Sequence, residues 1–96
     1  MNNKEKDKLL KDALNKRGIG FFNHKMVEEM AELTQVLCKW ENCLNGGDDD
    51  LKELRDKIQE ELGHVLAFSE ILKLVFDNSK ITHEKDKRIE RFKKYC

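Results

Sequence analysis

Two segments decide the fold: residues 22–44 read FNHKMVEEMAELTQVLCKWENCL, and residues 51–76 read LKELRDKIQEELGHVLAFSEILKLVF. Along the first segment, apolar side chains recur every three or four residues, at Met26, Met30, Leu33, Leu37, Trp40 and Leu44. The second segment keeps this spacing, with one serine among the apolar residues, at Leu51, Leu54, Ile58, Leu62, Val65, Ser69, Leu72 and Phe76. Such spacing is typical of one face of an α-helix. We therefore expect two long amphipathic helices that pack through these faces.

A short polar connection joins the two segments, and each segment carries one acidic stretch. The connection, residues 45–49, reads NGGDD, a length that favours an antiparallel helix pair. The acidic stretches are Glu28-Glu29-Met30-Ala31-Glu32 and Glu60-Glu61-Leu62-Gly63-His64. Both stretches lie at a similar distance from the connection, so the hairpin should place them beside each other.

The angular positions of these polar residues predict where their side chains meet. At 100° per residue, Glu29 and Glu61 each lie about 60° from the apolar line of their helix. Glu32 and His64 each lie about 120° from it, on the same hand. Because equal offsets fall on one flank of an antiparallel pair, we expect three carboxylates and one imidazole to converge beside the hairpin.

Shorter helices are expected on either side of this hairpin. A first helix ends at Gly18 and Gly20, and Asn23 is the expected N-cap of the first long helix. Asp48-Asp49-Asp50 supplies a cap for the second long helix, and Thr82 caps a short final helix. The expected fold class is therefore all-α: an antiparallel four-helix-bundle-like core with two long central helices, in one domain covering residues 1–96.

Composition limits the classes of partner and compartment. The 96 residues contain 19 basic and 19 acidic side chains, so the formal net charge of zero supports neither nucleic acid nor membrane as a partner. No apolar run approaches the length of a membrane span, and no apolar core of a signal peptide follows the N-terminus. Three cysteines without metal-ligand spacing indicate reduced thiols and a cytoplasmic protein. So short a chain buries a modest core, which predicts a homodimer or a higher homo-oligomer.

The acidic stretches admit two interpretations. Carboxylates drawn from two facing helices make an oxygen-rich site that suits Mg²⁺ or Mn²⁺, and such an ion can bridge phosphate oxygens and activate water. Alternatively, the glutamates simply face solvent, as acidic pairs often do in a chain with 40% charged residues. The equal offsets on two helices favour the metal site, since a solvated face has no reason to lie near the apolar line.

The two stretches carry a resemblance to a known family. Lys25-x-x-Glu28-Glu29-x-x-Glu32-Leu33, followed by Glu60-Glu61-Leu62-Gly63-x-Val65-Leu66, resembles the MazG-type all-α nucleoside triphosphate pyrophosphohydrolases. Their signature is EExxE, a spacer, then ExxD, on the two long helices of an antiparallel core. The resemblance covers roughly residues 22–76 and implies hydrolysis of a nucleoside triphosphate to its monophosphate and pyrophosphate.

The resemblance also implies roles for individual residues. It makes Glu29, Glu32 and Glu61 metal ligands, with Mg²⁺ as the expected ion and Mn²⁺ as an alternative. It makes Glu28 an outer group of the metal site or a base that orients water. Substrate phosphates would meet Lys25, Arg88 and Arg91. A solvated lysine, and arginines that complement the C-terminus of a helix, are the competing explanations for these three cations.

His64 departs from the family pattern, which has Asp at this position. Imidazole is a poor ligand for Mg²⁺ but an acceptable one for Mn²⁺ and other transition metals. Three readings follow: His64 binds a softer metal, or it supports the ligands from outside, or the site has lost part of its function. The alternative function is therefore a degenerate, non-catalytic homo-oligomeric module for nucleotide sensing or protein interaction.

Overall fold

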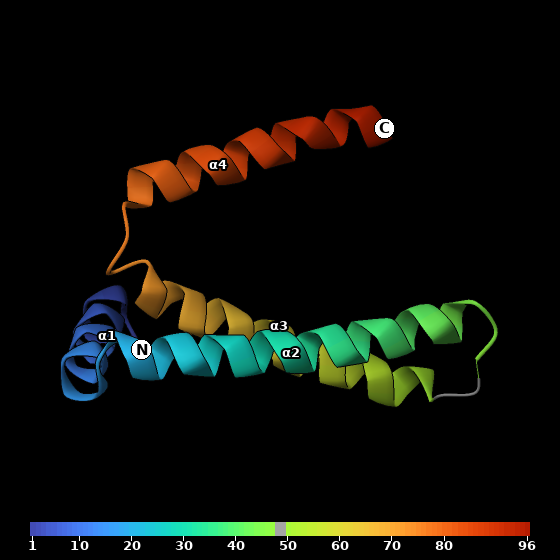
Figure 1. Ribbon diagram of the computed structural model, residues 1–96, viewed down its shortest axis with the longest axis horizontal. Helices are drawn as coiled ribbons and strands as arrows, with labels where there is room; N and C mark the ends of the chain where they lie inside the picture. Colours follow the sequence, from blue (N-terminus) through green and yellow to red (C-terminus); the bar gives the residue numbers. More distant parts are fainter. Residues whose placement is uncertain (48–49) are drawn as a thin grey trace.

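The computed structural model describes residues 1–47 and 50–96, and within these residues it contains helices and no strand. Four α-helices are followed by a terminal 3₁₀-helix (Figure 1): α1 (Asn3–Arg17), α2 (Ile19–Leu44), α3 (Leu51–Leu72), α4 (Asn78–Glu90) and η1 (Arg91–Tyr95). The all-α prediction is confirmed. Among the described helices, none is long and apolar enough to cross a membrane.

Gly18 alone separates α1 from α2. Its φ of 84° lies in the left-handed region, where glycine carries no steric penalty, and its N–H donates to the Leu14 carbonyl. Because this one residue makes the turn, α2 begins directly at Ile19. The expected break at Gly20 and the expected N-cap at Asn23 were therefore wrong, and both residues lie inside α2.

Aspartates cap the two later helices. The Asp50 carboxylate accepts from the backbone N–H groups of Lys52 and Glu53, as expected for an N-cap; Asp48 and Asp49, which shared that prediction, lie outside the described residues. Asp77 accepts in the same way from the backbone N–H groups of Ser79 and Lys80. This cap starts α4 at Asn78, so the predicted cap at Thr82 was wrong.

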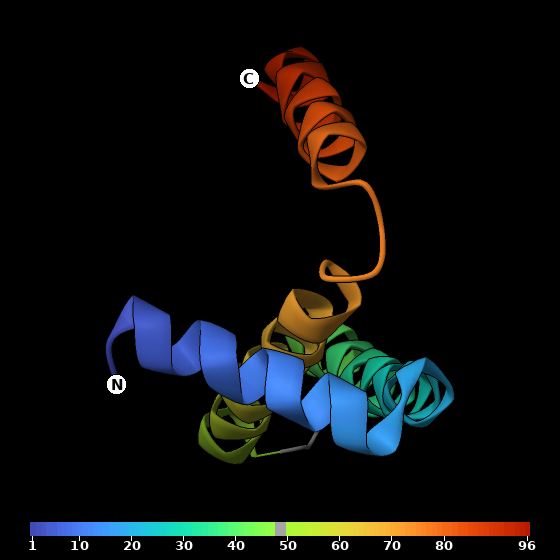
Figure 2. The same ribbon diagram turned by 90° about the vertical axis from the view of Figure 1, so that its left-hand side faces the viewer.

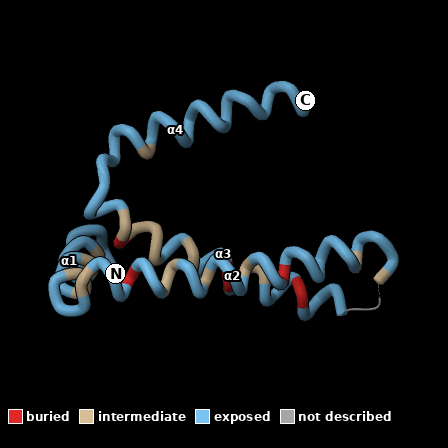
Figure 3. The backbone as a smooth tube through the Cα atoms, viewed as in Figure 1, coloured by how far each residue is buried: buried red, intermediate tan, exposed pale blue. Residues whose placement is uncertain are grey.

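Helices α2 and α3 form an antiparallel hairpin that holds most of the tertiary structure (Figure 1). The contact line differs from the predicted one. Met30 and Leu37, expected at its centre, are 51% and 38% exposed. Of the buried side chains of the described residues, Leu54 lies on the predicted line, and Phe22, Val36, Glu61 and Ile71 do not (Figure 3). Each helix is thus rotated toward its acidic stretch, and Glu61 lies in the contact line rather than on its flank.

The other helices are placed very differently. Helix α1 crosses one end of the hairpin (Figure 2) and is tied to α3 by a 2.9 Å ion pair between Lys6 Nζ and Glu70 Oε1. Helix α4 packs against neither α2 nor α3 and stands clear of them. The radius of gyration is 16.5 Å, against about 12.5 Å for a compact chain of this length. One chain therefore forms a hairpin with a crossing helix and a separate arm.

Candidate metal centre

Three side chains of the acidic stretches meet across the α2–α3 hairpin. Glu29 of α2, and Glu61 and His64 of α3, each offer one ligand atom, and these atoms all lie within 4.8 Å of one another. His64 Nδ1 is 3.1 Å from Glu29 Oε2 and 3.6 Å from Glu61 Oε2. The hairpin therefore brings together three of the four residues that the sequence placed around a cation.

Local helix geometry explains the convergence. Glu61 and His64 are three residues apart, so their side chains project from neighbouring turns of one face of α3. Glu29 occupies a position in α2 that faces α3, and the antiparallel pairing sets it opposite them. Exposure rises across the cluster: Glu61 is buried, Glu29 is intermediate and His64 is exposed. The cluster is thus anchored in the contact line and opens to solvent at the imidazole.

Glu61 is the residue with the most demanding environment. It is 2% exposed, and its Oε2 atom is buried without a hydrogen-bond partner. Its other oxygen, Oε1, lies 3.8 Å from Lys57 Nζ. A buried carboxylate oxygen without a donor is costly, so a cation beside Oε2 stabilises the hairpin. The proton of His64 or a divalent ion can supply that charge.

The charge state of His64 responds to the same carboxylates. Its hydrogen bond with Glu29 raises the pKa of the imidazole above the ordinary value of 6.5, against an opposing effect of burial. The negative charges of Glu29, Glu61 and Glu60 raise the pKa further. The raised pKa favours the imidazolium form of His64, whose single positive charge would offset part of the charge of the two carboxylates.

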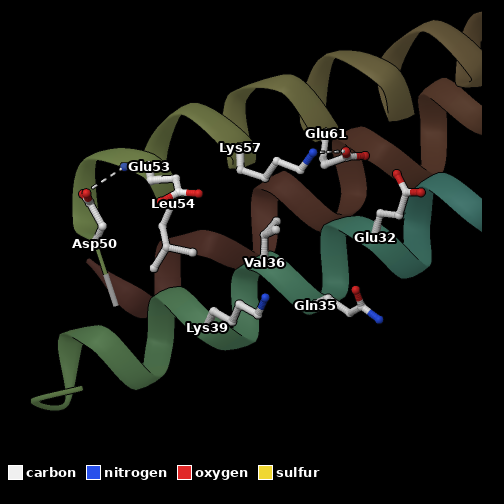
Figure 4. A pocket seen from close by; sticks show the side chains of 9 residues that line it. All are labelled: Glu32, Gln35, Val36, Lys39, Asp50, Glu53, Leu54, Lys57 and Glu61. Atoms are coloured by element: carbon white, nitrogen blue, oxygen red, sulfur yellow. Dashed lines mark hydrogen bonds and ion pairs between the residues drawn. The ribbon is translucent and has the colours of Figure 1, made fainter. Parts of the chain in front are cut away.

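Glu32 lies beside the cluster and not within it. It borders a groove of about 440 Å³ on the same flank of the hairpin as Glu61 (Figure 4). The groove runs toward the interhelical turn and is lined by Glu32, Gln35, Val36, Lys39, Asp50, Glu53, Leu54, Lys57 and Glu61. An extended ligand that starts at the cluster can therefore continue along the groove.

The sequence analysis missed Lys39 and Lys57, the two cations of the groove. A signal for them was present. Lys39 lies seven residues after Glu32, and Lys57 lies four residues before Glu61, so each shares a helix flank with a predicted ligand. The same angular argument that placed the carboxylates places these ammonium groups beside them.

Glu28 and Lys25 make their ion pairs along α2. The Glu28 carboxylate lies 2.8 Å from His24 Nε2 through Oε1 and 3.6 Å from Lys25 Nζ through Oε2. The Lys25 ammonium also lies 5.6 Å from the centre of the Phe21 ring. Neither residue belongs to the cluster of Glu29, Glu61 and His64.

Arg88 and Arg91 are distant from the cluster within one chain. Arg88 lies in the last turn of α4, Arg91 begins η1, and both are exposed. Because α4 packs against neither helix of the hairpin, the chain does not bring these guanidinium groups to its own groove.

Comparisons with protein-family models, with curated proteins and with solved structures found no match to this chain.

Proposed function

We propose that the protein is a divalent-metal-dependent nucleoside triphosphate pyrophosphohydrolase that releases a nucleoside monophosphate and pyrophosphate. The observation that carries the proposal is the meeting of Glu29, His64 and the buried Glu61 oxygen without a hydrogen-bond partner, beside a groove that Glu61 also lines. The resemblance of the two acidic stretches to MazG-type enzymes supports the same reaction.

The donor set fits a divalent cation. Glu61 Oε2 has no hydrogen-bond donor, the two carboxylates are ordinary ligands of Mg²⁺ and Mn²⁺, and the imidazole is an acceptable third ligand for Mn²⁺. Glu29, Glu61 and His64 would hold the ion, and Glu32 would hold either that ion or a second one from the adjoining groove. When bound, the ion supplies neutralisation of the triphosphate and activation of a water molecule.

The remaining residues would bind and orient the substrate. Lys57 and Lys39 line the groove and offset part of the phosphate charge. Glu28 orients the attacking water or supports the metal ligands, which requires its carboxylate to exchange its present pairs with His24 and Lys25. The proposed phosphate contacts outside the groove are Lys25, Arg88 and Arg91. We propose the cytoplasm as the compartment of the reaction.

Self-association is part of the proposal, and the partner is a second copy of the chain. Met30 and Leu37 lie about 60–80° from the contact line of α2, on the side away from Glu32. Leu62 and Leu66 lie on the matching side of α3, so one flank of the hairpin is apolar and the other carries the groove. A second hairpin would cover this apolar flank.

The separate arm favours the same partner. The C-terminal region exposes three apolar residues, Ile89, Phe92 and Tyr95, and helix α4 does not pack on the hairpin of its own chain. Helix α4 packed on a neighbouring hairpin would bury them and would carry Arg88 and Arg91 toward that neighbour. The radius of gyration, larger than that of a compact chain, is what an arm of this kind produces.

Hydrolysis is tested with purified protein, a panel of nucleoside triphosphates, and Mg²⁺ or Mn²⁺. Pyrophosphate should be released by the wild type, and release should fall at least about 100-fold in Glu61→Gln. Glu41→Gln, an exposed change on α2 outside the groove, should keep wild-type activity. Equal activity of Glu61→Gln and wild type would remove the cluster from the reaction.

One observation favours a second candidate, the non-catalytic homo-oligomeric module for nucleotide sensing or protein interaction. His64 already lies within 3.1 Å of Glu29 and 3.6 Å of Glu61, so a protonated imidazole can occupy the place of a metal ion. This candidate predicts nucleotide binding, or binding of a protein, without pyrophosphate release under either metal. The assay above, combined with equilibrium nucleotide binding, separates the two candidates.

A further inference from the structure

We infer that the cluster selects a first-row transition-metal ion over Mg²⁺, and that His64 binds this ion through Nδ1. The inference rests on the function proposed above, because it names the class of cofactor that the same site uses. It concerns the one position at which the chain departs from the ExxD pattern.

The positions of the donor atoms support direct ligation by His64. Its Nδ1 is the ring atom that faces both carboxylates, at 3.1 Å from Glu29 Oε2 and 3.6 Å from Glu61 Oε2. Two ligands of one octahedral ion with bonds near 2.1 Å lie about 3 Å apart when adjacent and about 4.2 Å apart when opposite. The distances to His64 are close to the adjacent spacing, so small side-chain shifts suffice to form the site.

An independent observation indicates that a cation belongs between these atoms. Glu61 is 2% exposed, its Oε2 has no hydrogen-bond partner, and this oxygen lies 3.6 Å from His64 Nδ1. Lys57 approaches the opposite oxygen, Oε1, and leaves Oε2 to the cluster. The charge of a divalent ion matches the two carboxylates that face it.

The chemistry of the third ligand decides which divalent ion is preferred. Carboxylates bind Mg²⁺ and Mn²⁺ alike, whereas imidazole suits Co²⁺ and Zn²⁺, is acceptable to Mn²⁺ and is a poor ligand for Mg²⁺. Ligation through Nδ1 also replaces the hydrogen bond between His64 and Glu29, and the bond from imidazole to Mg²⁺ is too weak to compensate for its loss. An ion that binds nitrogen well therefore gains more from this cluster than Mg²⁺ does.

The test measures metal binding by the full chain in the absence of nucleotide. Mn²⁺ binding is followed by loss of the electron paramagnetic resonance signal of the free ion, and Mg²⁺ is added as a competitor. We expect the wild type to bind Mn²⁺ at least about tenfold more tightly than Mg²⁺. In His64→Asp, the ratio of the two affinities should fall about tenfold, because Mg²⁺ then meets oxygen ligands only. His83→Asp makes the same change on α4, away from the cluster, and should leave the ratio unchanged.

A second measurement identifies the ligand atom. Paramagnetic Co²⁺ should shift the ring resonances of His64 far more than those of His24 and His83. Circular dichroism of each variant checks that helix content is retained, which is expected because His64 is exposed. Unaffected His64 resonances would overturn direct ligation.

The outcomes for binding and for hydrolysis are distinguishable. Three results would each overturn the inference: equal affinities for Mn²⁺ and Mg²⁺, an unchanged affinity ratio in His64→Asp, or no metal binding. After either of the first two results, pyrophosphate release can still uphold the proposed function. Tight Mn²⁺ binding through His64 without hydrolysis of any triphosphate would uphold the inference and overturn the proposed function.

Discussion

The α2–α3 hairpin and helix α4 are equally helical but differ in what holds them. The hairpin buries Phe22, Leu54 and Ile71, whereas the C-terminal region leaves Ile89 and Phe92 about half exposed. Asp77 starts α4 by a local cap, and this cap needs no tertiary contact. Capping therefore fixes where a helix begins, whereas the place of that helix in the fold depends on a partner surface, which one chain supplies for the hairpin but not for α4.

The largest expected effect on stability comes from replacing one isoleucine by alanine in each region. Ile71→Ala should lower the free energy of unfolding by about 2–4 kcal/mol, because Ile71 is 6% exposed and its loss leaves a cavity. Ile89→Ala should cost less than about 0.5 kcal/mol at low protein concentration, since Ile89 is 52% exposed. Urea denaturation followed by circular dichroism measures both. Similar losses at low concentration would mean that α4 is packed within its own chain.

The sequence predicted the hairpin well because apolar residues recur every three or four positions along both of its helices. The C-terminus of α2 at Leu44, the start of α3 at Leu51 and the cap at Asp50 agree with expectation. The end of α3 does not: the helix stops at Leu72, and residues 73–75 form turns. The apolar spacing continues to Phe76, beyond the end of the helix. The predicted end was too late because apolar spacing alone does not distinguish a helix from the turns that follow it.

The contact line was harder to predict, because two lines of residues fit the apolar pattern of α2. Apolar residues cover a wide arc of α2, so a line through Met26 and Leu33 can continue through Met30 and Leu37 or through Glu29 and Val36. Pattern reading prefers the first line because it contains no charge. The hairpin uses the second, which puts Glu29 and Glu61 into the interface. Charged residues at contact positions break the folding pattern, and such breaks concentrate at functional sites.

The candidate site was predictable to the extent that it belongs to the hairpin. The equal angular offsets predicted that Glu29, Glu32, Glu61 and His64 converge; the hairpin brings Glu29, Glu61 and His64 together, whereas Glu32 borders the neighbouring groove. Arg88 and Arg91 were placed by the resemblance alone, and no periodicity along α4 could say where α4 lies. Contacts between chains, or their absence, are not encoded in the spacing of one helix.

A second change asks whether the hairpin is less stable because of its acidic contact position. In metal-free buffer, Glu61→Leu should raise the free energy of unfolding by about 1–3 kcal/mol, because leucine fills a buried position that now holds a carboxylate with one oxygen lacking a hydrogen bond. Denaturation in the presence of a chelator measures the change. Glu60→Leu, at the exposed neighbouring position, should give no comparable gain. Destabilisation by Glu61→Leu would indicate that the carboxylate is already well compensated.

A third pair of changes asks whether α4 finds its partner surface on a second copy. Leu66→Glu on the apolar flank of the hairpin and Ile89→Asp on α4 should each weaken self-association at least about tenfold, because each places a charge in a proposed apolar interface. Sedimentation velocity over a range of concentrations measures the association.

Gln35→Glu is the matched control for this pair. It adds the same charge on the groove flank and should leave the association constant within about twofold. A wild-type chain that remains monomeric at high concentration, or an association that ignores both changes, would remove the second copy as the partner of α4.

The smallest expected effect lies in the charge of the cluster. The hydrogen bond with Glu29 raises the pKa of His64, so in metal-free protein the imidazole should titrate above 6.5, and Glu29→Gln should move its pKa back down. Because the folded-state pKa lies above the unfolded one, the ion pair stabilises the hairpin fully below the unfolded pKa. That stabilisation is lost as pH rises through the folded pKa. Ring-proton chemical shifts of His64 across this range measure the titration. A pKa unchanged by Glu29→Gln would show that the two groups are not coupled in solution, and the cluster would then lack the contact on which its response to both protons and metal ions depends.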